Sequence, residues 1–217
     1  MNNSGKKGII LGFCLILAFI AWTIMVLRVD VQPLGQNGIN IGFAALNTRF
    51  HELTGYRQSF YKVTEYLGYI PLLVCAAFGV FGAMQLVRGK SLKKVDPDIL
   101  LLGVYYIVVI AFYLLFNKLH INYRPEGELE ESYPSSHTLL VLSVMPTLVF
   151  QLRRRFPASM LRTAAIVLSI LFTAVVVIGR LLSGVHWLTD IVGGILLSLG
   201  LYLIYRSAVH ILDQRIQ

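Results

Sequence analysis

The stretch GRLLSGVHWLTD, residues 179–190, lies between two long apolar runs and contains an arginine, a histidine and an aspartate. His186 and Asp190 are four residues apart, so on a helix the carboxylate can reach the imidazole one turn away. A carboxylate on one ring nitrogen fixes the tautomer and leaves the other nitrogen free to attack or to bind. Because charged side chains at a membrane edge are costly, we expect Arg180, His186 and Asp190 to have a task, and handling an anion suits all three.

The composition predicts a membrane protein. Of the 217 residues, 56% are hydrophobic and 14% are charged, whereas soluble domains carry roughly 25% charged residues. Six segments come near the ~20 residues that a spanning helix needs, namely 8–27, 67–87, 98–117, 137–152, 161–181 and 187–206. We therefore expect an all-α polytopic membrane protein of six transmembrane helices, with a single integral membrane domain over residues 1–217.

The net charge of +8 is explained by topology, since basic residues flanking membrane helices orient the chain. No basic stripe with interleaved aromatic residues lies outside the apolar runs, so we expect no nucleic acid partner. The N-terminus, the loops 88–97 and 152–162, and the C-terminus hold the larger share of the 19 Lys and Arg residues. This bias predicts that both termini are cytoplasmic and that the 118–136 loop lies on the extracytoplasmic face.

The longest connection between apolar runs is 28–66. Apolar residues at 39, 43, 46 and 50 follow helical spacing within it. We expect an amphipathic helix there, either on the membrane surface or packed over the mouth of the bundle, and periodicity alone does not choose between the two.

A second polar cluster precedes the fourth apolar run. Lys118 and Arg124 are followed by Pro134-Ser135-Ser136-His137, which stands where a helix would begin. A helix N-terminus offers unpaired N–H groups and a positive dipole end, which suit phosphate, and serine hydroxyls there either cap the helix or donate to a ligand. Phosphoryl transfer needs cationic donors, a nucleophile and an acid, and the two polar clusters together supply all of them.

In this arrangement the chain resembles the type 2 phosphatidic acid phosphatase (PAP2) superfamily, whose pattern is Lys-x6-Arg-Pro, Pro-Ser-Gly-His and Ser-Arg-x5-His-x3-Asp. The second and third motifs match in order and internal spacing, and all three fall within 118–190. Three positions depart from the pattern. Lys118 is one residue too close to Arg124, Ser136 replaces the motif glycine, and Gly179 replaces the motif serine.

The resemblance implies a role for each matching residue. His186 would be the nucleophile that forms a phosphohistidine, Asp190 would orient it, and His137 would protonate the leaving alkoxide and then activate water. The phosphate-binding residues that the resemblance implies are Lys118, Arg124, Ser135, Ser136 and Arg180. It implies no metal and no cofactor.

We therefore expect a PAP2-like helical bundle that acts as a metal-independent lipid phosphatase. Its partners would be the bilayer of a bacterial cell membrane and a lipid phosphomonoester or pyrophosphate, hydrolysed at the extracytoplasmic face. Undecaprenyl pyrophosphate, phosphatidylglycerol phosphate and phosphatidic acid all fit the motifs. A lipid-to-lipid phosphotransferase would use the same site, whereas a membrane transporter would place ionisable residues near mid-membrane in several helices. The sequence leaves the oligomeric state open.

Overall fold

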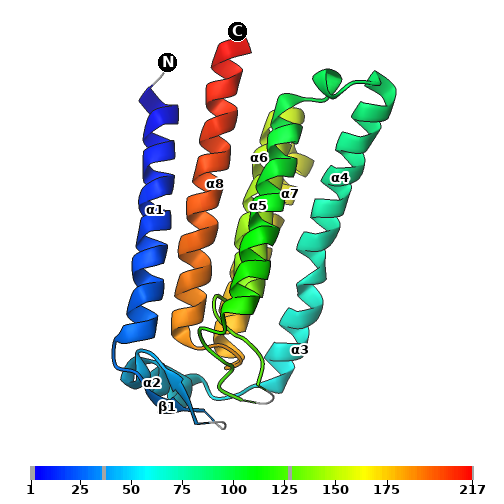
Figure 1. Cartoon of the computed structure of the whole chain (residues 1–217). Coiled ribbons are helices and arrows are strands. Elements are labelled where there is room, and N and C mark those ends of the chain that lie inside the picture. Colours follow the sequence, from blue (N-terminus) through cyan, green and yellow to red (C-terminus); the bar gives the residue numbers. More distant parts are fainter. Residues whose placement is uncertain (1–2, 36–37, 127–128, 217) are drawn as a thin grey trace.

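A computed structural model describes residues 3–35, 38–126 and 129–216, and most of them lie in a bundle of long helices (Figure 1). The bundle helices are α1 (Asn3–Arg28), α4 (Tyr69–Gly89), α5 (Pro97–Leu119), α6 (Ser136–Arg155), α7 (Met160–Leu182) and α8 (Leu188–Ile216). Both chain ends lie at one end of this bundle, and the connections that follow α1, α5 and α7 lie at the other end. The predicted all-α bundle is confirmed.

Five helical segments in the described part of the chain are long and apolar enough to cross a membrane. These are α1, the combined segment Gln58–Gly89, α5, α7 and α8. The segment predicted at 137–152 forms α6, whose last turn carries three arginines and which is therefore less apolar overall. Val141 and Val144 of α6 are nearly inaccessible, so this helix lies inside the bundle and needs little lipid-facing apolar surface.

Two tyrosine hydroxyls of α5 form hydrogen bonds to α6. The Tyr105 hydroxyl on α5 donates to the Ser143 carbonyl at 2.9 Å, and Tyr106 shares a 2.8 Å hydrogen bond with Thr147. Such bonds satisfy polar atoms that would otherwise be stranded in an apolar environment. They anchor α5 to α6, so that the N-terminus of α6 has a fixed place at the end of the bundle.

The connection between α1 and α4 folds over the end of the bundle away from the termini (Figure 1). It contains the antiparallel strands β1 (Gln32–Leu34) and β2 (Ile39–Ile41), then the helices α2 (Ala44–Thr54) and α3 (Gln58–Leu67). The side chain of Asn47 on α2 is buried and donates to Thr189 of α8 at 3.1 Å. Of the two expected placements, α2 therefore takes the one over the mouth of the bundle.

The prediction of a helix over residues 39–50 is wrong for residues 39–43. Residues 39–41 alternate two isoleucines with an asparagine and pair with β1, and the helix begins only at Ala44. The turn between them is tight, since a side chain at Gly42 would collide with the backbone of Val26. β-Branched residues flanking a polar one favour a half-buried strand, which explains the departure.

The opposite end of the bundle is held by an ion-pair network near the short helix η1 (Leu92–Lys94). Asp98 on α5 is 6% exposed and accepts hydrogen bonds from Arg155 and Gln151 of α6, each at 3.0 Å. Arg154 of α6 also pairs with Asp213 of α8 at 2.6 Å. These contacts join α5, α6 and α8 at the end that carries both termini.

Candidate active site

The predicted polar clusters meet at the end of the bundle away from the termini. The turn between α7 and α8, the N-terminus of α6, the 120–135 loop and α3 all contribute side chains there. A continuous chain of contacts links the two predicted histidines, because Arg180 contacts His186 and also Glu65, which in turn lies 3.8 Å from His137.

His186 lies in the turn before α8, so the expectation that it shares a helix face with Asp190 is wrong in detail. The α8 helix begins at Leu188, and Asp190 reaches back from its first turn. The Nδ1 atom of His186 is 3.7 Å from Oδ2 of Asp190. The turn is tight, because a side chain at Gly184 (φ 69°) would collide with the carbonyl of Gly55.

The carboxylate of Asp190 is fully buried and held on both oxygens. Oδ2 accepts from the backbone N–H of Trp187 at 3.0 Å, and Oδ1 accepts from Nδ2 of Asn122 at 2.8 Å. A buried carboxylate with its oxygens engaged in this way has a fixed orientation, and its Oδ2 lies beside the Nδ1 edge of the His186 ring.

Arg180 lies at the opposite edge of the His186 ring. Its Nη2 lies 3.1 Å from Nε2 of His186. A guanidinium can only donate, so Nε2 carries the lone pair and the ring proton is on Nδ1, facing Asp190. Burial, and then the positive charges of Arg180 and Arg124, lower the pKa of His186 well below its usual value. The imidazole is therefore held neutral, in the tautomer whose Nε2 carries the lone pair.

Two arginines converge on Tyr61 of α3. The guanidinium carbons of Arg180 and Arg124 lie 5.3 Å and 5.6 Å from the centre of its ring, and Arg124 donates to its hydroxyl at 3.1 Å. Within the described residues the buried Nε atoms of both arginines have no hydrogen-bond partner. Two guanidinium groups with donors still unused form a cradle for an anion.

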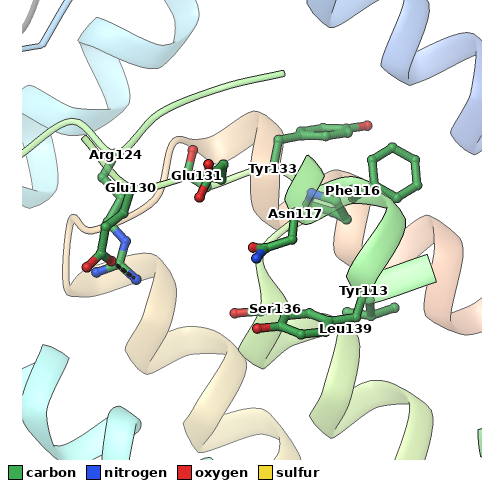
Figure 2. Close-up of a pocket in the computed structure, with 11 residues that line it drawn as sticks. Tyr113, Phe116, Asn117, Arg124, Glu130, Glu131, Tyr133, Ser136 and Leu139 are labelled. Atoms are coloured by element: carbon green, nitrogen blue, oxygen red, sulfur yellow. Dashed lines mark ion pairs between the residues drawn. The ribbon is translucent and has the colours of Figure 1, made fainter. Parts of the chain in front are cut away.

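Each arginine of the cradle also contacts a carboxylate. Arg180 is fully buried, and its Nη1 lies 3.3 Å from Oε2 of Glu65. Arg124 pairs with Glu130 at 2.8 Å, as Figure 2 shows. These carboxylates balance the positive charge of the two arginines, and an anion that bound here would have to compete with them.

The Pro-Ser-Ser-His motif begins α6. Ser135 is buried, its N–H donates to the Asp190 carbonyl at 3.0 Å, and its hydroxyl accepts from Thr138 rather than capping the helix. The Ser136 hydroxyl lies 3.5 Å from Nδ1 of His137. The bond between Ser135 and Asp190 fixes the start of α6 directly against the turn that carries His186.

Lys118 is the one predicted site residue that the structure does not bring to this cluster. It is exposed on the last turn of α5, whereas its neighbour Asn117 points into a polar cavity (Figure 2). The helix continues to Leu119, so a one-residue slip rotates the side chain by about 100°. The spacing departure seen in the sequence therefore has a structural consequence.

Three residues that the sequence reasoning missed complete the cluster, namely Tyr61, Glu65 and Asn122. The first two lie on α3, within a connection that carries no recognisable motif. Asn122 is 1% exposed and lies inside the predicted motif region. A polar residue adjacent to a motif arginine was the one available signal, and it was too weak to single out.

Two cavities adjoin the cluster. A polar one of about 250 Å³ is lined by Asn117, Arg124, Glu130 and Glu131 (Figure 2). A groove of about 410 Å³ runs between α4, α5 and α6, with Glu65 and His137 at its polar end. The apolar residues of this groove include Leu72, Val109, Ile110, Leu114 and Leu140. Ser136 lines both cavities, so they meet at the N-terminus of α6.

In the described part of the chain, no group of three or more His, Cys, Asp or Glu side chains is placed to hold a metal ion. The candidate site contains two imidazoles and two guanidinium groups, with carboxylates around them.

Comparisons with known proteins give one family match and one similar fold. Residues 111–212 match the family model of the PAP2 superfamily. No curated protein matches the sequence. The fold is similar to the crystal structure of the first transmembrane PAP2 type phosphatidylglycerolphosphate phosphatase from Bacillus subtilis, with a TM-score of 0.64 and 18% sequence identity. That similarity covers 95% of this chain and 97% of the other, and at this identity it shows the fold.

Proposed function

We propose that this chain, whose residues 111–212 match the PAP2 superfamily model, is a membrane phosphatase that hydrolyses a lipid phosphate through a phosphohistidine at His186. The observation that carries the proposal is the position of His186, between the buried carboxylate of Asp190 and the guanidinium of Arg180. This pair of neighbours keeps Nε2 unprotonated and places it beside a phosphate-binding cation.

In the first step Nε2 of His186 attacks phosphorus and the bond from phosphorus to the lipid oxygen breaks. Arg180 and Arg124 donate to the non-bridging phosphate oxygens, with the first amides of α6 as further donors. The proton on Nδ1 stays with the ring, and Asp190 stabilises the resulting cation. The imidazolium form of His137, which the Glu65 carboxylate 3.8 Å from its Nε2 favours, gives its proton to the leaving oxygen, so the lipid departs as a neutral alcohol.

In the second step water replaces the lipid. His137, now without its proton, takes one from water, and the oxygen attacks phosphorus as the bond to Nε2 breaks. The products are inorganic phosphate and the starting form of His186. A lipid alcohol in place of water would give phosphotransfer, and product analysis with added acceptor lipid separates the two outcomes.

The groove beside His137 supports a lipid as the substrate. It runs along α4, α5 and α6 between apolar side chains, and its polar end lies at the site. An amphiphile can place its chain in such a groove while its phosphate meets the arginines. The substrate classes that fit are the lipid phosphomonoesters and pyrophosphates named above.

We also propose that the site faces the extracytoplasmic side of a bacterial membrane. The termini share one end of the bundle and the site lies at the other. The excess of Lys and Arg in the termini and short loops supports a cytoplasmic location for the first end.

The experiment is phosphate release from a panel of lipid phosphates by the purified protein in detergent, with EDTA present. We expect release by the wild type and none by His186→Asn. His210→Asn is the matched control, because His210 is an exposed histidine of α8 whose ring contact is with Phe150, far from the site. Undiminished release by His186→Asn would contradict the nucleophile, and loss of release in EDTA would contradict metal independence.

A further inference from the structure

A carboxylate lies at the polar end of the lateral groove, where a second phosphate of the substrate would have to lie. We propose that Glu65 makes this phosphatase prefer lipid phosphomonoesters over lipid pyrophosphates. The inference rests on the proposed function and specifies its substrate class.

Glu65 lies between the phosphate cradle and the groove. A single oxygen, Oε2, is 3.3 Å from Nη1 of Arg180 and 3.8 Å from Nε2 of His137. Glu65 and His137 line the groove together, and the Glu65 side chain is 42% exposed. A substrate whose phosphorus is at His186 and whose chain lies in the groove must therefore pass this carboxylate.

The two substrate classes differ at the atoms that pass Glu65. In a phosphomonoester the group next to the attacked phosphate is an alcohol oxygen, which leaves uncharged once His137 has protonated it. In a pyrophosphate that group is a second, anionic phosphate, which would lie beside Glu65. Like charges brought together in a partly desolvated site disfavour the ligand that carries the extra charge.

Among the described residues, Arg124 is the only Lys or Arg side chain that lines either cavity. Arg124 is the cationic residue of the polar cavity, and it is already paired with Glu130 at 2.8 Å. Glu131 lines the same cavity and adds a further carboxylate. Neither cavity therefore provides a Lys or Arg side chain without a carboxylate partner for a second phosphate.

The test compares farnesyl phosphate with farnesyl pyrophosphate, which share one lipid chain. We expect the wild-type initial-rate kcat/KM to favour the monophosphate by about tenfold or more. Glu65→Gln removes the charge at nearly constant shape and should reduce that preference by about tenfold, and Glu65→Lys should reduce it further. The matched control is Glu52→Gln, on an exposed position of α2 outside the groove, which should leave the ratio unchanged.

The outcomes separate this inference from the proposed function. A wild-type preference for the pyrophosphate would overturn the inference while upholding the hydrolase, and this ratio is measurable even if a Glu65 variant fails to fold. The inference would also be overturned if the monophosphate-to-pyrophosphate ratio of kcat/KM in both Glu65 variants stayed within about twofold of the wild-type ratio. Hydrolysis of neither farnesyl substrate, nor of any lipid in the panel, would overturn the proposed function and the inference with it.

Discussion

Nη2 of Arg180 lies 3.1 Å from Nε2 of His186, and this contact joins the anion cradle to the reactive imidazole. The arginine is fully buried, yet its Nε has no hydrogen-bond partner within the described residues. A buried guanidinium with an unused donor is costly for stability alone. Its placement is explained if a phosphate oxygen completes its contacts during turnover.

Replacing Arg180 should therefore impair catalysis more than binding. We expect Arg180→Lys to lower kcat by about 100-fold to 1000-fold, because a lysine cannot reproduce the planar donor geometry. Steady-state kinetics on the best lipid phosphate measure this. The control is Arg162→Lys, a half-buried arginine at the far end of α7 whose Nη1 donates to the Phe156 carbonyl. A lysine variant with near wild-type kcat would contradict the role of Arg180.

We predict that Asn122 affects catalysis through its hydrogen bond to Asp190. Its amide is the donor to Oδ1 at 2.8 Å, so Asn122→Ala frees the carboxylate to turn away from His186. By analogy with outer-shell partners of metal ligands, we expect kcat to fall by about tenfold to 100-fold with little change in KM. Asn40→Ala, at the exposed middle position of strand β2, is the matched control. An unchanged kcat in Asn122→Ala would show that Asp190 is held by its other contacts.

The pH dependence of stability should report on His186. Its pKa is lowered in the folded protein by burial and by the two arginines, so below about pH 6.5 the unfolded chain takes up a proton that the folded chain does not. Stability is therefore lost as the pH falls through this range. We expect the thermal midpoint to drop between pH 7 and pH 5 by more in the wild type than in His186→Asn. Equal drops in the two proteins would contradict a neutral, buried imidazole.

The ion-pair network at the other end should affect stability without affecting chemistry. Asp98→Ala leaves Arg155 and Gln151 without their buried acceptor, and breaking such a pair costs up to about 3 kcal/mol. We expect a lower thermal midpoint in detergent and an unchanged kcat per folded molecule. A large fall in kcat with intact stability would mean that this end communicates with the site.

The sequence predicted those parts of the molecule that depend on local pattern. Hydropathy located the six bundle helices, and motif spacing picked out His137, Arg180, His186 and Asp190, which the structure places in one cluster. The one-residue departure of Lys118 from the motif spacing was also visible in the sequence. It predicts a displaced side chain, because a helix turns by about 100° per residue.

Other features depend on contacts that no local pattern encodes. Glu65 and Arg180 are in contact although they are 115 residues apart in the sequence. Only the packing of α3 against α7 brings them together. The hairpin before α2 was missed because four apolar residues happened to follow helical spacing. The turn at Gly42 and the pairing with β1 overrode that periodicity.

Transfer of radiolabelled phosphate from substrate to protein tests the central claim most directly. Acid-labile, alkali-stable label should appear on the wild type within a turnover, map to the peptide that contains His186, and be absent from His186→Asn. Label on another residue, or turnover that continues in the variant, would contradict the account.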